Sequence, residues 1–321
     1  MTHAFVFPGQ GSQAVGMGRE LAEAFPLARD VFAEVDAALG QNLTHLMFEG
    51  PEDELTLTEN AQPALMAVSM AALRVLEDEA GIGLADMARF VAGHSLGEYS
   101  ALAAAGSFSL ADTARLLKTR GRAMQGAVPV GAGGMAALLG LDLEPAREAA
   151  AEAARGDEVC AAANDNAPGQ VVVSGSRAAV ERAVEIAKTK GARRAVMLSV
   201  SAPFHCALMA PAAEVMAEAL ETVAMHDPKV PLVANVTAAP VTDAAEIRQL
   251  LVKQVTGMVR WRESVLYMGE QGVTTLVEMG ASKVLSSMVR RIDREMSGVS
   301  VGLPAEIEAF IAHIQGTGAD A

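Results

Sequence analysis

The chain has 321 residues, 51% of them hydrophobic and only 4% aromatic, which is enough for one large domain with an inserted lobe or for two domains in tandem. Its 25 basic and 39 acidic side chains give a net charge of −14, which argues against a nucleic-acid binder because neutralising phosphates requires a basic face. The two cysteines lack metal-ligand spacing, no signal peptide is recognisable, and no apolar run is long enough to span a bilayer. We therefore expect a cytoplasmic protein without a membrane segment, metal or redox cofactor.

The first 127 residues alternate apolar strands with helices. The strands are apolar along most of their length, which is typical of strands buried on both faces, and helical periodicity follows each of them. This order indicates a parallel sheet with helices on its faces. The expected strands are residues 3–7 and 89–92, and the expected helices are residues 17–25, 27–39, 61–79, a helix ending near residue 106, and 110–124.

The character of the sequence changes at residues 128–134, VPVGAGG, which we interpret as a hinge or a lobe boundary. The third glycine of a dinucleotide-binding loop is missing there, so this stretch does not indicate nucleotide binding. The elements that follow run strand, helix, strand, strand, helix, strand, which is the split βαβ or ferredoxin-like order. They are expected at residues 135–141, 144–155, 158–164, 170–174, 178–190 and 193–198.

The pattern of the first segment resumes after residue 198. The expected elements there are helices at residues 205–223, 244–255, 261–271 and 282–291 and strands at residues 232–236 and 274–278. We therefore predict an α/β protein with two subdomains. Residues 1–127 and 199–321 form a parallel-sheet subdomain, and residues 128–198 form an inserted ferredoxin-like subdomain.

Residues 93–97, GHSLG, match the G-x-S-x-G pattern of a serine nucleophile on a strand-to-helix turn. Gly93 and Gly97 allow the chain to bend, the bend exposes the hydroxyl of Ser95, and the amide of Leu96 lies where it can donate to an oxyanion. The alternative is a tight turn whose serine only caps the helix. Pattern and context coincide here, so we favour the nucleophile.

A serine nucleophile needs a base, and six histidines are available. His205 is the best candidate because it follows a proline loop at the expected start of a helix, whose positive end should favour the neutral imidazole. His94 is adjacent to Ser95 and badly placed to reach it. A lone histidine is often structural, so spacing alone leaves both possibilities open.

A third group should orient the histidine, but no acidic residue fits that role. Asp112 resembles a helix start, and three other acids, Asp142, Asp157 and Asp165, belong to the inserted segment. A backbone carbonyl or an amide is the alternative.

Two further features have functional interpretations. Gln10 lies in a glycine-rich loop at a strand end, without the lysine of a phosphate loop, and its backbone amide could be a second oxyanion donor beside Ser95; the alternative is a plain turn. Arg120 lies in an apolar helix and is followed by Gly121. A guanidinium there can bind a substrate carboxylate through two parallel hydrogen bonds, although helical arginines are more often surface residues.

Seven segments spread from end to end resemble one family. They are FVFPGQGSQ at 5–13, TENAQPALMA at 58–67, GHSLGEYSAL at 93–102, RGRAMQ at 120–125, NDNAPGQVVVSG at 164–175, PFHCALM at 203–209 and EMGASKVL at 278–285. In this order they resemble the malonyl-CoA:acyl carrier protein transacylases, acyltransferases of fatty acid and polyketide synthesis. The resemblance implies an α/β-hydrolase-like large subdomain with a ferredoxin-like insertion.

The same resemblance implies a role for each matching residue. Ser95 is the acylated nucleophile, His205 is its base, and Arg120 holds the free carboxylate of the malonyl group. Gln10 and Leu96 match the positions whose amides form the oxyanion hole. The implied neighbours of these groups are Gln254, whose main-chain carbonyl orients the histidine, His94, which lies near the acyl group, and Phe204, a pocket wall.

The implied activity is transfer of malonyl from malonyl-CoA to the phosphopantetheine thiol of acyl carrier protein through a malonyl-serine ester. Malonyl-CoA is a substrate, no cofactor is required, and we expect a monomer. The alternatives are a trans-acting acyltransferase of a polyketide synthase, a serine thioesterase or esterase, and a non-catalytic carrier-protein binding module. The acidic carrier protein should dock on a basic island, for which the candidates are Lys188, Lys190, Arg193, Arg194, Lys283, Arg290 and Arg291.

Overall fold

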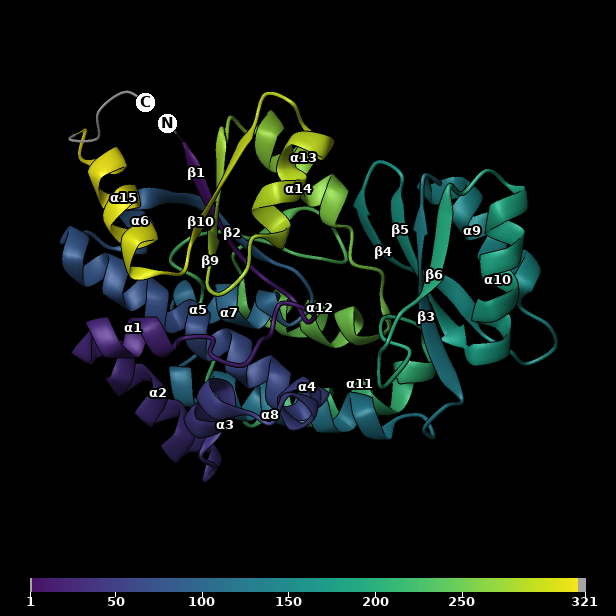
Figure 1. The fold of residues 1–321 in the computed structure, drawn as a ribbon, viewed down its shortest axis with the longest axis horizontal. Coiled ribbons are helices and arrows are strands. Elements are labelled where there is room, and N and C mark those ends of the chain that lie inside the picture. The colour runs from purple at the N-terminus through teal and green to yellow at the C-terminus, as the bar shows by residue number, and fades with distance from the viewer. Residues whose placement is uncertain (1, 317–321) are drawn as a thin grey trace.

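The structure is a computed structural model that describes residues 2–316, and its strands form two sheets (Figure 1). The larger sheet has the order β10-β9-β1-β2-β7-β8, and its neighbouring strands are parallel except for β7 and β8. The predicted parallel sheet is thus confirmed. Its strands are β1 (His3–Phe7), β2 (Ala88–Gly93), β7 (Leu232–Val233), β8 (Pro240–Val241), β9 (Thr275–Met279) and β10 (Ser297–Val301).

Helices cover both faces of the larger sheet, as the alternation of strands and helices predicts. One face is covered by α1 (Arg19–Ala24), α2 (Pro26–Leu39), α3 (Leu43–Glu49), α4 (Glu52–Thr56), α5 (Thr58–Ala80), α6 (Leu84–Met87), α7 (Gly97–Ala104), α8 (Leu110–Gly126), α11 (Ala210–Glu221), α12 (Ala244–Thr256) and α15 (Pro304–Ile314). The other face is covered by α13 (Trp261–Glu270) and α14 (Val284–Ile292).

The central strand β1 shows why the strands are apolar along their length. Phe5 and Phe7 pack into the core beneath α5 and α7, whereas Ala4 and Val6 pack against α13 and α14 on the opposite face. All four side chains are fully buried. Successive side chains of a strand point to opposite faces, so a sheet covered on both sides requires an uninterrupted apolar run.

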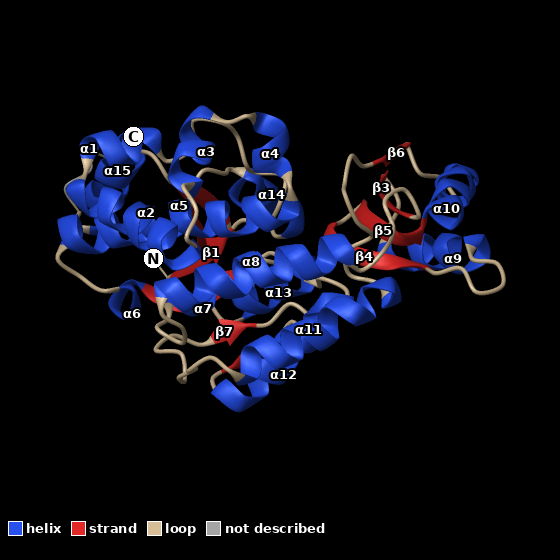
Figure 2. Ribbon diagram, turned by 90° about the horizontal axis from the view of Figure 1, so that it is seen from below, coloured by secondary structure: helices blue, strands red, loops and turns tan. Residues whose placement is uncertain are grey.

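The smaller sheet lies at one end of the molecule with two helices beside it (Figure 2). Its elements are β3 (Gly133–Leu139), α9 (Leu143–Ala153), β4 (Cys160–Ala167), β5 (Gln170–Ser176), α10 (Arg177–Thr189) and β6 (Arg194–Met197). The sheet order is β4-β5-β3-β6 and every neighbouring pair is antiparallel, which confirms the ferredoxin-like prediction. The division of the chain at residues 128 and 198 stays a proposal, supported by this grouping of strands; residues 1 and 317–321 of the proposed ranges lie outside the described part.

One face of the small sheet turns toward the larger subdomain. Val171 and Val173 pack under α9 and α10, whereas Met135 and Val172 belong to the core of the larger subdomain. The alternation along β5 therefore gives the small sheet one face for its own core and another for a shared interface.

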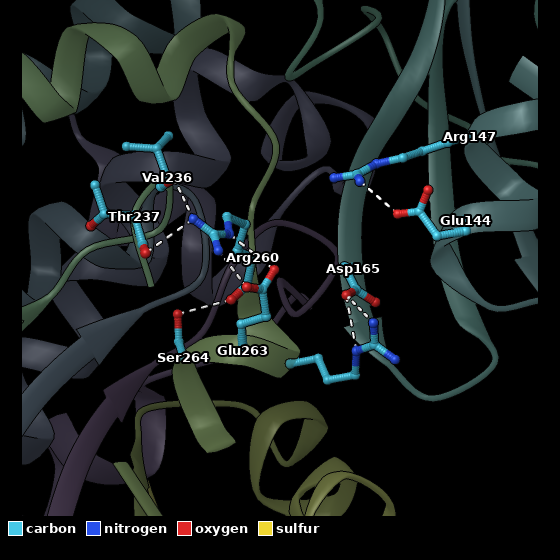
Figure 3. Close-up of polar contacts among 9 residues, drawn as sticks. Glu144, Arg147, Asp165, Val236, Thr237, Arg260, Glu263 and Ser264 are labelled. Carbon is cyan, nitrogen blue, oxygen red and sulfur yellow. Dashed lines mark hydrogen bonds and ion pairs between the residues drawn. The ribbon is translucent and has the colours of Figure 1, made fainter. Parts of the chain in front are cut away.

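Strand β4 joins the small subdomain to α13. The amide of Asp165 donates to the carbonyl of Val259, and the amide of Val259 donates to the carbonyl of Ala163, each at 2.9 Å. The buried carboxylate of Asp165 also accepts a hydrogen bond from Nε of Arg262 at 2.9 Å (Figure 3). Separating a buried carboxylate from its guanidinium partner costs several kcal/mol of free energy, on the order of 3–5 kcal/mol. This ion pair therefore holds β4 of the small subdomain against α13 of the larger one.

Several sequence-based boundaries need correction. The helix expected from residue 205 begins only at Ala210, after the 3₁₀ turn Ala207–Met209, and the strand expected at 232–236 is limited to Leu232–Val233. The elements α3, α4, α6, β8, β10 and α15 were not expected. Most of these are too short to show a hydrophobic period. No helix among residues 2–316 is both long and apolar enough to cross a membrane.

Candidate active site

Ser95 stands on a strained turn between β2 and α7. Its φ of 55° lies in the left-handed region, where a non-glycine side chain is disfavoured. A Cβ on Gly93 would lie 1.9 Å from the carbonyl carbon of Gly97, and one on Gly97 would lie 2.2 Å from the carbonyl oxygen of Phe7. The two glycines are therefore needed for close backbone packing, and the unusual backbone angle falls on the serine itself.

His205 faces the hydroxyl of Ser95 from the loop that precedes α11. The Oγ of Ser95 lies 2.7 Å from Nε2 of His205, whose ring is buried. On the other side of the ring, Nδ1 lies 2.9 Å from the carbonyl oxygen of Gln254 and 3.1 Å from that of Gly257. Carbonyl oxygens only accept, so Nδ1 carries the proton and Nε2 is free to accept from the serine hydroxyl.

The electrostatic surroundings keep His205 neutral. Burial, and then the positive charge of Arg120, lower the pKa of His205 to about 3. The helix dipole invoked from the sequence is not the cause, because α11 begins at Ala210 and His205 lies in the preceding loop with a φ of 59°. The neutral imidazole expected from the sequence thus has a different physical cause, which is burial and the charge of Arg120.

Arg120 reaches the site from α8 and is almost completely buried. Its Nη2 donates to Oγ of Ser95 at 3.1 Å and to Oε1 of Gln254 at 2.8 Å, and its Nη1 donates to Oε1 of Gln62 at 2.8 Å. The guanidinium carbon lies 5.7 Å from the centre of the Tyr99 ring. These hydrogen-bond partners are neutral, so no carboxylate pairs directly with the guanidinium beside the serine hydroxyl.

A cavity of about 390 Å³ opens over Ser95 at the junction of the two subdomains. Its lining includes these predicted site residues: Gln10, His94, Ser95, Leu96, Arg120, Phe204 and His205. The small subdomain contributes Met135, Asn164, Asn166 and Val172. Gln254 is fully buried behind the cavity. The chain thus brings all the predicted residues together, although they span positions 10 to 254.

The flanking predicted residues have distinct surroundings. Gln10 follows β1 and lines the cavity, and its side-chain Nε2 donates to Oγ1 of Thr58 at 3.1 Å. His94 shares a hydrogen bond of 2.8 Å with Oδ1 of Asn166, and burial lowers the pKa of His94. Phe204 is 8% exposed and lies on the cavity wall.

The polar residues of this site that were not predicted include Gln62, Glu98, Asn166 and Asn235. Asn235 braces the turn directly, because its Oδ1 accepts from the amide of Ser95 at 2.8 Å and its Nδ2 donates to the carbonyl of Gly93 at 2.6 Å. A signal for Asn235 existed, since it follows β7 at the edge where parallel strands place ligands. The sequence also contained a signal for Glu98, because it is a charged residue in the first turn of a helix made mostly of small and apolar residues.

Comparisons with known proteins point to one family over nearly the full length of the chain. The family model of an acyl transferase domain matches residues 4–304. The chain is 46% identical over 308 residues to the malonyl CoA-acyl carrier protein transacylase of Bacillus subtilis (strain 168), covering 96% of each protein. The crystal structure of an acyl-carrier-protein-S-malonyltransferase from Bartonella henselae is 56% identical, with a TM-score of 0.95 over 98% of this chain and 100% of that one.

A further solved structure contains a type II polyketide synthase acyl-carrier protein in complex with its malonyl-transacylase. The matching chain is 43% identical, with a TM-score of 0.94 over 98% of this chain and 100% of that chain. Both subdomains are included in these matches. With Ser95, His205 and Arg120 gathered in one cavity, and with relatives matched over nearly their full length, the chain belongs to the malonyl CoA-acyl carrier protein transacylase family.

Proposed function

We propose that the protein transfers the malonyl group of malonyl-CoA to the phosphopantetheine thiol of acyl carrier protein and thereby supplies fatty acid synthesis. The observation that carries this proposal is the geometry around Ser95. Its Oγ lies 2.7 Å from an imidazole nitrogen and 3.1 Å from a buried guanidinium. A serine hydrolase needs only the first contact, whereas an enzyme that selects an acyl group with a free carboxylate needs both.

In the first half-reaction, Ser95 is the nucleophile and His205 is the base. Nε2 of His205 takes the hydroxyl proton while Oγ attacks the thioester carbonyl of malonyl-CoA. The tetrahedral intermediate then expels the thiolate of coenzyme A, which receives that proton from His205. The product is a malonyl ester on Ser95. The carbonyls of Gln254 and Gly257 hold Nδ1–H throughout, so the imidazole keeps its orientation without an acidic residue.

In the second half-reaction, the phosphopantetheine thiol of the carrier protein enters the cavity. His205 accepts the thiol proton, the sulfur attacks the ester carbonyl, and Oγ of Ser95 leaves and recovers the proton. The malonyl group ends on the carrier protein, and the free enzyme is regenerated. The two half-reactions break the thioester of malonyl-CoA, form and break the ester on Ser95, and form the thioester of the carrier protein, so no atom changes its oxidation state and no oxidant or reductant takes part.

The oxyanion of both tetrahedral intermediates needs donors, for which we propose the backbone amides of Gln10 and Leu96. Leu96 precedes the first turn of α7, where unpaired amides point out of a helix, and Gln10 lies on the facing loop of the same cavity. His94 and Phe204 complete the wall around the acyl group in this proposal.

Arg120 provides the selectivity for malonate. Its buried guanidinium can bind a carboxylate by charge-assisted hydrogen bonds, and an acetyl group would leave it without that partner. This residue also argues against a plain esterase or thioesterase, which has no need of a buried cation beside its serine. The hydrogen-bonded Ser95–His205 pair argues against a non-catalytic binding module.

A second candidate is an acyltransferase that serves a polyketide synthase. It is favoured by the 43% identity to the malonyl-transacylase solved with a type II polyketide synthase carrier protein. The chemistry at Ser95 would be the same. The carrier protein alone would differ, so transfer rates to carrier proteins of the two kinds, measured side by side, separate the candidates.

The proposed function is tested by intact-mass spectrometry after mixing the protein with malonyl-, methylmalonyl- or acetyl-CoA. Malonyl-CoA should add one malonyl group, which addition of holo acyl carrier protein should then remove. The variant Ser95→Ala should form no adduct, because the nucleophilic oxygen is gone. A persistent adduct in that variant would exclude Ser95, and rapid release to water in place of the carrier thiol would indicate a hydrolase.

The role of Arg120 is tested with Arg120→Ala. Malonyl transfer should fall at least about a hundredfold while acetyl transfer changes much less, because a charge-assisted bidentate contact contributes about 3 kcal/mol to binding a carboxylate. The measurement is kcat/KM for each acyl-CoA with a fixed concentration of carrier protein. Equal losses for both substrates would contradict the selectivity role.

A further inference from the structure

Glu98 lies directly behind the nucleophile, in the first turn of α7, and its side chain is fully buried. Its Oε2 accepts hydrogen bonds from the amide of Asn235 and from Nε2 of Gln254, both at 3.0 Å. A carboxyl group in such a place is usually paired with a lysine or an arginine, because an isolated charge is costly to bury. The partners of Glu98 are two neutral groups instead, which calls for an explanation.

The side chain of Gln254 bridges Glu98 and Arg120. Its Nε2 donates to Oε2 of Glu98 at 3.0 Å and to the carbonyl of Ser95 at 2.9 Å, while its Oε1 accepts from Nη2 of Arg120 at 2.8 Å. The two ends of an amide are chemically different, and both groups on the Glu98 side accept hydrogen bonds. The NH₂ end must therefore face Glu98, and the oxygen must face the guanidinium.

This bridge holds Arg120 without neutralising it. The guanidinium is fixed by the amide oxygens of Gln62 and Gln254, neither of which carries a charge. A direct ion pair with Glu98 would compete with the carboxylate of an incoming acyl group. With one amide interposed, the negative charge still offsets part of the cost of burying Arg120, and the positive charge remains available to a ligand.

We propose that Glu98 is a positioning residue that fixes the amide of Gln254 and through it aims Arg120 at the free carboxylate of the acyl group. The inference rests on the proposed function and deepens it, because it makes Glu98 a determinant of acyl selectivity that never touches the substrate. Burial raises the pKa of Glu98 to about 7. A protonated carboxyl group still keeps one acceptor oxygen, so the bridge persists in either protonation state.

The test compares Glu98→Met, which keeps the length of the side chain but has no acceptor oxygen, with Glu98→Gln, which keeps one. The readout is the rate of Ser95 acylation by malonyl-CoA and by acetyl-CoA. Glu98→Met should lower the malonyl-to-acetyl rate ratio by about tenfold or more, the effect of losing the hydrogen bond from Gln254 that connects Glu98 to Arg120. Glu98→Gln should keep the ratio within about threefold of the wild type, because its amide oxygen replaces Oε2.

Glu278→Met is the matched control. Glu278 is also fully buried, its Oε2 also accepts two hydrogen bonds, from the amide and the hydroxyl of Ser286, and its Oε1 is likewise buried. It lies at the end of β9 and does not line the cavity. Its substitution should cost comparable stability and leave the acyl selectivity unchanged.

Two outcomes would overturn the inference. If Glu98→Met slows acylation by both acyl-CoAs equally, the rate ratio is unchanged, and Glu98 then only supports the turn that carries Ser95 and has no role in selectivity. Should Glu98→Met fail to fold, Gln254→Met removes the bridge from its other end and must lower the same ratio; a wild-type ratio there overturns the inference equally. Failure of the proposed function is recognised separately, because the wild-type protein would then form no malonyl adduct.

Discussion

The two residues that would exchange the proton, Ser95 and His205, both have left-handed backbone angles, with φ values of 55° and 59°. Each such angle costs on the order of 1 kcal/mol or more in a non-glycine residue. The surroundings hold both in place: Asn235 forms hydrogen bonds with the amide of Ser95 and the carbonyl of Gly93, and the carbonyls of Gln254 and Gly257 hold the imidazole. These strained backbone angles place Oγ of Ser95 2.7 Å from Nε2 of His205.

The pH dependence of acylation follows from the state of His205. Because its pKa is lowered to about 3, the imidazole stays neutral and basic far below pH 6.5, where an ordinary histidine gains a proton. The rate of Ser95 acylation by malonyl-CoA should thus stay nearly constant from pH 8 to pH 5 in stopped-flow or quenched-flow measurements. Between about pH 6.5 and 3 the unfolded chain would bind a proton that the folded one does not, so stability should fall as the pH falls.

A matched control for this profile is Glu98→Gln, which removes a buried carboxyl group whose pKa is raised to about 7. A rate that falls tenfold for each pH unit below 6.5 in both proteins would show that His205 has an ordinary pKa, and would contradict the burial argument.

Among the helices, α8 and α5 approach each other closely next to the arginine of the site. A Cβ on Gly121 would lie 2.5 Å from Cα of Glu59 and 2.6 Å from the carbonyl oxygen of Thr58. Both obstacles are backbone atoms, which cannot rotate away. The glycine after Arg120 therefore sets the distance between the helices, and through it the depth to which the guanidinium reaches into the cavity.

Gly121→Ala should lower the free energy of unfolding by about 1–3 kcal/mol, as expected for overpacking against backbone. It should also raise the KM for malonyl-CoA, because α8 must move away and take Arg120 with it. Gly126→Ala is the control in the same helix, since a Cβ there meets no atom within 4 Å. Urea denaturation and steady-state kinetics give both quantities; equal stabilities of the two variants would show that the contact is not limiting.

Over the whole molecule, the structure divides six of the seven basic residues proposed for carrier-protein docking into two groups, and Arg290 belongs to neither. Lys188, Lys190 and Lys283 each form ion pairs with glutamates of their own surface, which offsets their charge. Three arginines instead line a shallow hollow at the seam between the subdomains: Arg193, Arg194 and Arg291. We propose this arginine hollow as the part of the basic island that attracts the acidic carrier protein to a monomeric enzyme.

The double variant Arg193→Glu/Arg194→Glu should raise the KM for carrier protein several-fold and leave the KM for malonyl-CoA unchanged, with a weaker effect at high salt. Lys188→Glu, whose lysine is already paired with Glu185, serves as the control and should change neither constant by much. An unchanged KM for carrier protein in the double variant would reject the hollow as a docking surface.

The sequence by itself determined the parts of this protein that depend on local chain geometry. Strands buried on both faces require apolar runs, so the parallel sheet was predictable, and the alternation of elements from residue 135 to 198 was enough for the ferredoxin-like lobe. The turn at Ser95 was predictable because both glycines are needed within five residues of chain. Arg120 and His205 were candidates by residue type, and the family resemblance added their roles.

The tertiary structure alone decided how these groups act on one another. The cause of the neutral His205, the bridge from Glu98 through Gln254 to Arg120, and the contact of His94 with Asn166 join residues far apart in the chain. Hydrogen bonds and pKa values depend on distances of a few ångströms and on burial, and no spacing along a sequence encodes either when the partners lie on different elements.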